Sequence, residues 1–156
     1  MHRIVVTTIV LALGATGVWA QNLEAIKQRQ DAMQTIARAS AANYNMMIGK
    51  APIDLAKVQA GLKTFQETMP KFKDLFADNA KGGDSQATPK VWAERAAFNA
   101  ALEKFIADSK MAASGIKDEE SFKKQYPAVA AGCGGCHKEK DGFAPKLGDS
   151  LKRVKW

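Results

Sequence analysis

The sequence predicts an all-α protein, an antiparallel four-helix bundle. Three observations lead to this prediction. Apolar and small residues recur every three or four positions through four stretches of the chain, the alternation typical of β-strands is scarce, and the connections between the stretches are short. A chain of 156 residues is long enough for one ordinary domain with its own core.

The first two helices are expected over residues 22–48 and 53–77. In each, the residues at three-to-four spacing define the face that should point into the bundle. Pro70 lies inside the second stretch and should kink that helix or tighten it locally. The inward series are Leu23, Ile26, Gln30, Met33, Ala37, Ser40, Tyr44 and Met47 in the first helix, and Leu55, Val58, Leu62, Phe65, Met69, Phe72 and Phe76 in the second.

The third and fourth helices follow a Gly-rich loop over residues 81–89. The third helix is expected over residues 90–114, with Thr88 as its N-cap and Gly115 as its stop. The fourth begins near Asp118 and contains Pro127, which should interrupt it. The inward series are Trp92, Phe98, Leu102, Phe105, Ser109 and Ala112 in the third helix, and Phe122, Tyr126, Val129, Cys133 and Cys136 in the fourth.

Residues 1–20 have the features of a cleaved secretory signal peptide. His2 and Arg3 form a short polar start, residues 4–13 are largely apolar, and residues 14–20 end in small residues, with Val18 and Ala20 at the positions read by a signal peptidase. The apolar stretch is short for a membrane span, and no other candidate follows it. We therefore expect export to a bacterial periplasm, with an uncleaved N-terminal anchor as the alternative.

Near the C-terminus, Cys133, Cys136 and His137 form the run Cys-Gly-Gly-Cys-His. This spacing is typical of covalent c-type haem attachment. The two thiols can add to the vinyl groups of a haem, and the adjacent imidazole can reach the iron as an axial ligand. The chain has no other cysteine, and its only other histidine, His2, lies in the predicted signal peptide. The sequence thus predicts one covalent haem c, with its iron, on the inward face of the last helix.

Other interpretations of these residues are weaker. A structural zinc site needs four Cys or His ligands, and the chain offers three adjacent ones. A thioredoxin-like motif would follow a strand and open a helix, whereas this motif ends a helical stretch. A disulfide between Cys133 and Cys136 is permitted in an oxidising compartment, but it leaves His137 without a role.

The charge of the chain indicates the kinds of partner it can bind. The net charge is +7, and loss of Arg3 with the signal peptide lowers it by one. A moderately basic surface suits acidic redox partner proteins or anionic membrane surfaces, and solubility alone explains it equally well. Nucleic acid is not an expected partner, because no dense basic run with interleaved aromatic residues occurs.

A haem motif at the end of the fourth helix of a bundle resembles the class II c-type cytochromes, the cytochrome c′ family. Class I cytochromes carry the motif near the N-terminus. The resemblance covers residues 23–137 and implies a four-helix haem domain over residues 21–142, which often forms a homodimer through its first two helices. Its local marks are Arg29-Gln30-Asp31-Ala32-Met33, Asn45-Met46-Met47-Ile48-Gly49, Val91-Trp92-Ala93-Glu94-Arg95 and Cys133 to His137.

The family has two functional branches, and the resemblance implies a choice between them. Low-spin members such as the cytochrome c-556 type place a first-helix methionine on the iron and carry electrons. High-spin members leave the iron five-coordinate and bind nitric oxide or carbon monoxide. Met33 stands at the matching first-helix position, so a one-electron carrier ligated by His137 and Met33 is expected. The alternative is a gas-binding protein in which Met33 is core packing near an open iron.

Two further expectations follow from the resemblance. Arg29 matches a family arginine that contacts a haem propionate, with a solvated arginine as the alternative. Lys140 and Asp141 stand where relatives carry an aromatic and a basic residue. Residues 143–156 are a C-terminal extension that could dock on the bundle, touch a partner or be loosely ordered. No enzymatic activity is expected, because without His2 the chain has no second histidine for distal acid–base chemistry.

Overall fold

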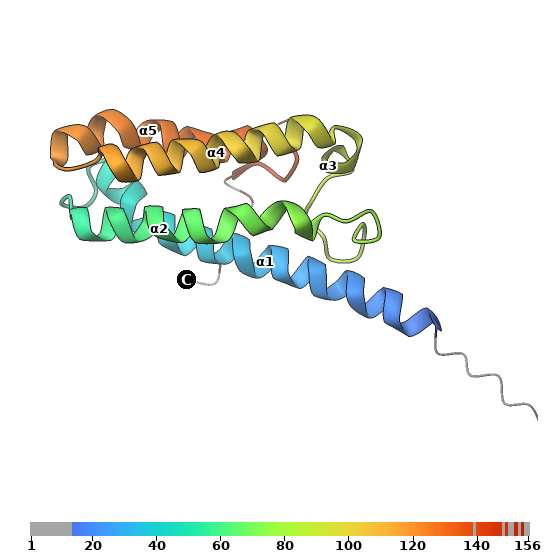
Figure 1. The fold of residues 1–156 in the computed structure, drawn as a ribbon. Coiled ribbons are helices and arrows are strands. Elements are labelled where there is room, and N and C mark those ends of the chain that lie inside the picture. Colours follow the sequence, from blue (N-terminus) through green and yellow to red (C-terminus); the bar gives the residue numbers. More distant parts are fainter. Residues whose placement is uncertain (1–13, 139, 148, 150–151, 153, 155–156) are drawn as a thin grey trace, which may run out of the picture.

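The computed structural model describes residues 14–138, 140–147, 149, 152 and 154, with side chains from Leu23 onward. Its long helices are arranged as an antiparallel bundle, with α1 and α2 in one layer and α4 and α5 in the other (Figure 1). The part of the chain that is described contains no β-strand. The helices are α1 Gly14–Met47, α2 Leu55–Phe72, the 3₁₀ helix η1 Lys73–Leu75, α3 Lys90–Ala93, α4 Arg95–Gly115 and α5 Glu119–Cys136.

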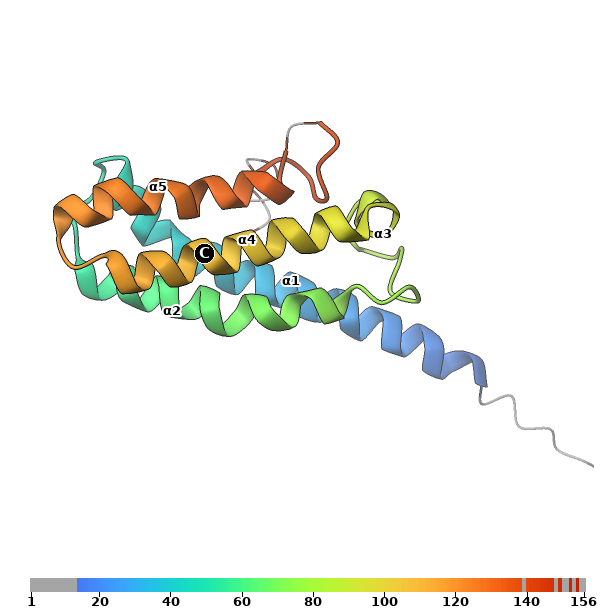
Figure 2. The ribbon, with the colours of Figure 1, turned by 45° about the horizontal axis from the view of Figure 1, so that its top comes forward.

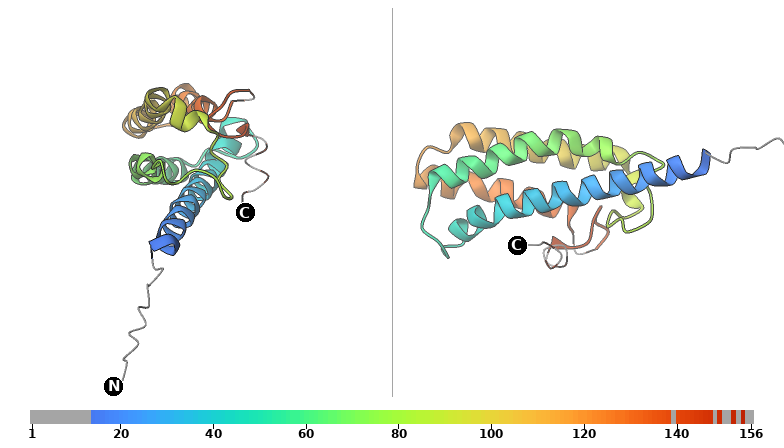
Figure 3. Two further views of the ribbon diagram at one scale, coloured as in Figure 1. Left: turned by 90° about the vertical axis from the view of Figure 1, so that its right-hand side faces the viewer. Right: turned by 90° about the horizontal axis from the view of Figure 1, so that it is seen from below.

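Each long helix packs mainly against the next one in the order α1, α2, α4, α5. α1 packs along α2, α2 along α4 and α4 along α5, whereas α1 and α5 touch only sparsely. In the end-on view, the N-terminal part of α1 diverges from the other helices (Figure 3). The core lies between α2, α4 and α5, where Val58, Leu62, Phe122 and Val129 are each at most 1% exposed. A cavity lies between α1 and α5 and is lined by side chains of both helices.

Several helix boundaries match the sequence prediction. Asp118 caps α5, with its carboxylate accepting from Ser121 N–H at 2.8 Å. Hydrogen bonds from the Ser121 hydroxyl and from this N–H lower the pKa of Asp118. α4 ends at Gly115 as expected. α2 continues through Pro70 and then tightens into η1. Among the described residues, no helix is both long and apolar enough to cross a bilayer. Residues 1–13 of the predicted signal peptide lie outside the described residues.

The predicted third helix is wrong in two respects. It is broken at Glu94 (φ −119°, ψ 48°) into α3 and α4. The break accompanies two side chains that reach back across the bundle, since Trp92 Nε1 and an Arg95 guanidinium nitrogen both donate to the carbonyl of Phe76. Thr88 is not the N-cap, because its hydroxyl donates to Gly142 O at 2.8 Å. Long-range hydrogen bonds therefore override the local helix signals here.

The inward face of α1 is rotated from the predicted one. Leu23 and Tyr44 were expected to be inward, and both expectations are wrong, since the two residues are 59% and 50% exposed. The buried series runs through Arg29, Ile36 and Asn43 at seven-residue spacing, one position before the expected series. Arg29 and Asn43 are polar, so a search for apolar periodicity passes over them.

Gly61 permits the close contact between α1 and α2. A Cβ atom at Gly61 would lie 2.6 Å from Asn43 Nδ2 and 2.9 Å from Ala39 O. Asn43 is fully buried, and its amide donates to Val58 O at 3.3 Å. Only glycine therefore fits between the two helices at this crossing.

We predict that Gly61→Ala lowers the free energy of unfolding by about 1–3 kcal/mol, the usual cost of overpacking a core, although alanine is the better helix former. Ala60 is exposed on the same turn, so Ala60→Ser is the matched control and should change stability by about 0.5 kcal/mol or less. Denaturant unfolding followed by far-UV circular dichroism measures both. Equal stability of the two variants would contradict the described helix contact.

Candidate haem site

The last turn of α5 brings the motif residues to one cavity. Cys133 and Cys136 lie on the inward face of α5, and His137 follows as its C-cap, with its N–H donating to Cys133 O at 3.0 Å. All three line a cavity of about 480 Å³. Both thiols are free. Burial raises the pKa of Cys133, and burial together with the neighbouring Cys133 raises the pKa of Cys136 to about 11, so both thiols are protonated at neutral pH.

The imidazole of His137 is held by a hydrogen bond to the backbone. His137 Nδ1 lies 2.8 Å from Pro145 O. A carbonyl oxygen can only accept, so Nδ1 carries the proton and donates it. The neutral ring then has its lone pair on Nε2, which is the form that binds a metal ion.

The cavity walls suit a large, flat, mainly apolar group. Phenylalanine side chains from α2, α4 and the loop form much of the wall, and the α1 side contributes the small residues Ala37 and Ser40. Gly132 brings α5 close to α4, since a Cβ atom there would lie 2.8 Å from the Phe105 ring. A volume of this size lies within the range of cofactor sites. With both thiols and the imidazole at one end, the donor set fits a covalently attached haem.

Met33 and Met69 are the methionines that line this cavity within the described part of the chain. Met33 reaches it from α1 and is half-buried, whereas Met69 reaches it from α2 and is buried. Met46 is placed elsewhere, with its sulfur accepting from Asp54 N–H at 3.1 Å. Met111 is 63% exposed. The structure thus brings Met33 to the cavity together with Met69, for which the sequence predicted a core position.

Arg29 lies at one edge of the cavity and is 5% exposed. Its guanidinium donates to Leu75 O at 2.8 Å, to Ala80 O at 3.1 Å and to Ser85 Oγ at 3.0 Å. It also stacks 4.7 Å from the centroid of the Phe76 ring. Burial lowers the pKa of Arg29. Arg29 therefore fixes the loop after α2 at the cavity edge, a role the sequence did not indicate.

The C-terminal extension contributes to the same site. Phe143, Ala144 and Leu147 line the cavity, and Phe143 is 8% exposed. Figure 2 shows the chain turning after α5 at the end of the bundle where α3 lies. Of the three alternatives for this extension, docking on the bundle is the one that residues 143–147 adopt.

Comparisons with known proteins agree with this fold. The family model described as Cytochrome C′ matches residues 24–139. A cytochrome c′ of Rhodopseudomonas palustris is 35% identical over 127 residues, which is 81% of this chain and 82% of that protein. A cytochrome c-556 of the same organism is 34% identical over 148 residues, covering 88% and 95%. The solved cytochrome c′ from Rhodopseudomonas palustris has 32% identity and a TM-score of 0.72 over 79% of this chain and 97% of that one.

A four-helix bundle with a haem-attachment motif on its last helix defines a class II c-type cytochrome. The chain belongs to the cytochrome c′ family. It is accordingly a haem c protein, and Cys133 and Cys136 fit the attachment motif of the family.

We predict that the haem stays on the chain when the holoprotein is denatured and extracted with acid and organic solvent, because two thioether bonds hold it. Mass spectrometry should show the chain heavier by one haem. The double variant Cys133→Ala, Cys136→Ala should lose this retention. Haem that extracts freely from the unmodified protein would contradict covalent attachment.

Proposed function

We propose that the protein is a one-electron carrier of the bacterial periplasm whose iron is ligated by His137 and Met33. The observation that carries this proposal is that Met33, on α1, lines the same cavity as Cys133, Cys136 and His137, on α5. When bound, haem c supplies an iron that gains and loses one electron. The residues of the chain hold that iron in fixed surroundings, and none of them is proposed to act in an enzymatic reaction.

Two ligands from different helices suit electron transfer. His137 is oriented by its Nδ1–H bond to Pro145 O at 2.8 Å, and Nε2 is the nitrogen proposed to bind the iron. Met33 approaches from the helix that diverges from α5. Imidazole and thioether are both neutral, and methionine as an axial ligand tends to raise the reduction potential. Ligands that stay bound in both redox states keep the geometry similar, and the apolar walls limit the entry of water.

The contact of Arg29 with a haem propionate remains part of the proposal. Arg29 lines the cavity, which supports it. Its two Nη atoms already hold the loop carbonyls of Leu75 and Ala80. A propionate would therefore meet a guanidinium whose position is fixed in advance, which lowers the entropy lost on contact.

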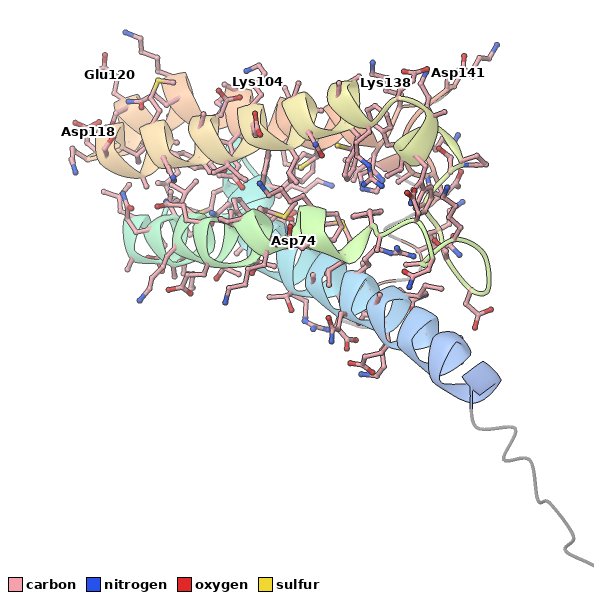
Figure 4. The ribbon with its side chains drawn as sticks, turned by 45° about the vertical axis from the view of Figure 1, so that its right-hand side comes forward. Asp74, Lys104, Asp118, Glu120, Lys138 and Asp141 are labelled. Carbon is pink, nitrogen blue, oxygen red and sulfur yellow. The ribbon has the colours of Figure 1, made fainter. Side chains whose placement is uncertain are left out.

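The partner is proposed to be an acidic redox protein that docks beside the site. Lys90, Lys138 and Lys146 line a groove next to the cavity, together with Asp141. In Figure 4, Lys138 and Asp141 lie at the end of the bundle where α5 finishes, while Asp118 and Glu120 lie at the opposite end. A positive rim near the haem would steer an acidic partner toward it.

The protein is further proposed to be exported to the periplasm and to form a homodimer. The predicted signal peptide supports a periplasmic location, where covalent haem attachment takes place in bacteria. Leu23, Tyr44 and Ile48 are exposed apolar residues on or next to α1. A homodimer formed through the first two helices would cover apolar side chains of this kind.

The alternative function is the binding of nitric oxide or carbon monoxide at a five-coordinate iron. In that case Met33 would be a wall of the cavity and not a ligand. The similarity to known proteins does not decide between the two, since identity to a cytochrome c′ and to a cytochrome c-556 is 35% and 34%. The optical spectrum decides, because six-coordinate His/Met iron is low-spin.

We predict that the unmodified protein is low-spin and that Met33→Leu converts it to a high-spin form that binds carbon monoxide. Leucine keeps most of the side-chain volume and removes the sulfur, so packing changes little. The reduction potential should fall as well, because thioether ligation favours ferrous iron. Optical spectra of both redox states and a potentiometric titration measure these effects.

Met69→Leu is the matched control, because Met69 lines the same cavity from α2. It should leave the iron low-spin. If Met69→Leu changes the spin state and Met33→Leu does not, Met69 is the ligand. A high-spin spectrum of the unmodified protein would refute the carrier and support the gas-binding alternative.

A further inference from the structure

The segment after the haem motif, residues 141–146, is built into the bundle, and we name it the C-terminal strap. Asp141 has a left-handed backbone conformation, with φ at 55°, which turns the chain back toward α5. Phe143 of the strap is 8% exposed and meets Phe98 of α4 edge-on, with ring centroids 5.4 Å apart. This aromatic contact anchors the strap in the core.

Hydrogen bonds fix the strap on both sides. The backbone N–H of Thr88 donates to Phe143 O at 2.9 Å, and the Thr88 hydroxyl donates to Gly142 O at 2.8 Å. Ala144 N–H donates to Cys136 O at 3.2 Å, a carbonyl that the end of α5 leaves without an intrahelical partner. A Cβ atom at Gly142 would lie 2.9 Å from Cys136 O and from Lys138 N, so glycine allows this close approach.

The strap ends at the imidazole of the haem motif. Pro145 O accepts the hydrogen bond from His137 Nδ1 at 2.8 Å. Proline fixes its own φ and restricts the residue before it to extended conformations, so Ala144 and Pro145 form a stiff pair. The anchors at residues 142–144 and the fixed φ of Pro145 therefore limit the positions that the Pro145 carbonyl can take.

We propose that the C-terminal strap is a positioning element for the axial ligand. The Pro145 carbonyl holds His137 in its Nδ1–H tautomer and in one ring orientation, and thereby presents Nε2 to the iron. This inference rests on the proposed ligation of the iron by His137. Hydrogen bonds to the second ring nitrogen of a metal-bound histidine fix its tautomer and raise its basicity. The strap lies beyond residue 139, where the match to the family model ends.

Two variants loosen the strap without altering His137. Thr88→Val removes the hydroxyl that donates to Gly142 O and keeps the branched shape of the side chain. Gly142→Val adds atoms where three backbone atoms already lie within 2.9 Å of a Cβ position. Thr64→Val is the control, because the Thr64 hydroxyl donates to Ala60 O within its own helix. Thr88→Val is mild enough to keep the proposal testable if Gly142→Val does not fold.

A chain that begins at Gln21 contains one histidine, so isotopically labelled histidine reports His137 alone. We predict that the His137 Nδ1 proton of the ferrous holoprotein exchanges slowly with solvent. If the ferrous iron is high-spin, carbon monoxide is added to make it low-spin for this measurement. The strap variants should speed this exchange on the order of tenfold, as expected for the loss of about one hydrogen bond. The NMR chemical shifts of the haem methyl groups in the ferric protein depend on the orientation of the His137 ring. These shifts should also change in the strap variants.

The possible results distinguish the positioning role of the strap from the ligation of the iron by His137, on which that role depends. Thr64→Val should match the unmodified protein in both measurements. Unchanged exchange and unchanged methyl shifts in both strap variants would overturn the positioning role and leave the ligation intact. An Nε2 resonance typical of free imidazole in the unmodified holoprotein would overturn the ligation itself, and the strap proposal with it.

Discussion

The opening between α1 and α5 is the constraint on which the rest of the structure depends. α1 packs on α2 and α5 packs on α4, but the two outer helices do not close on each other, and a cavity of about 480 Å³ remains. The lining is mainly apolar, and in the absence of an occupant it would be exposed to water. A large apolar group would cover this surface, and the covalent haem of the family is a group of that kind.

Three segments distant in sequence meet around this cavity. The last turn of α5 supplies Cys133, Cys136 and His137, and α1 supplies Met33. The C-terminal strap passes behind His137 and accepts its Nδ1–H bond. Each segment is held by its own contacts, such as the α1–α2 crossing at Gly61 and the anchors of the strap at Thr88. Rigid support from several elements keeps a metal site in place through a change of redox state.

The sequence predicted the features that depend on local signals. Spacing and residue type are enough to predict four helical stretches and the haem motif at the end of the last one. They also predict the cap at Asp118 and the stop at Gly115. The features it missed depend on long-range hydrogen bonds. Arg29 and Asn43 are polar residues on the buried seam of α1, and Arg29 is satisfied by loop carbonyls some 50 positions away. The Thr88 hydroxyl donates to Gly142 O and does not cap α3, although the Thr88 carbonyl accepts from Val91 N–H of that helix. The acceptor for His137 is a backbone carbonyl, which no sequence pattern identifies.

The proposed site holds a haem iron between His137, at the end of α5, and Met33 on α1. X-ray absorption at the iron edge of the ferric holoprotein tests it most directly, because the fine structure reports the atoms bound to iron whatever the spin state. We expect one sulfur and five nitrogens around the iron, with the sulfur absent in Met33→Leu. An iron shell of nitrogens alone in the unmodified protein, or a sulfur that persists in Met33→Leu, would contradict it.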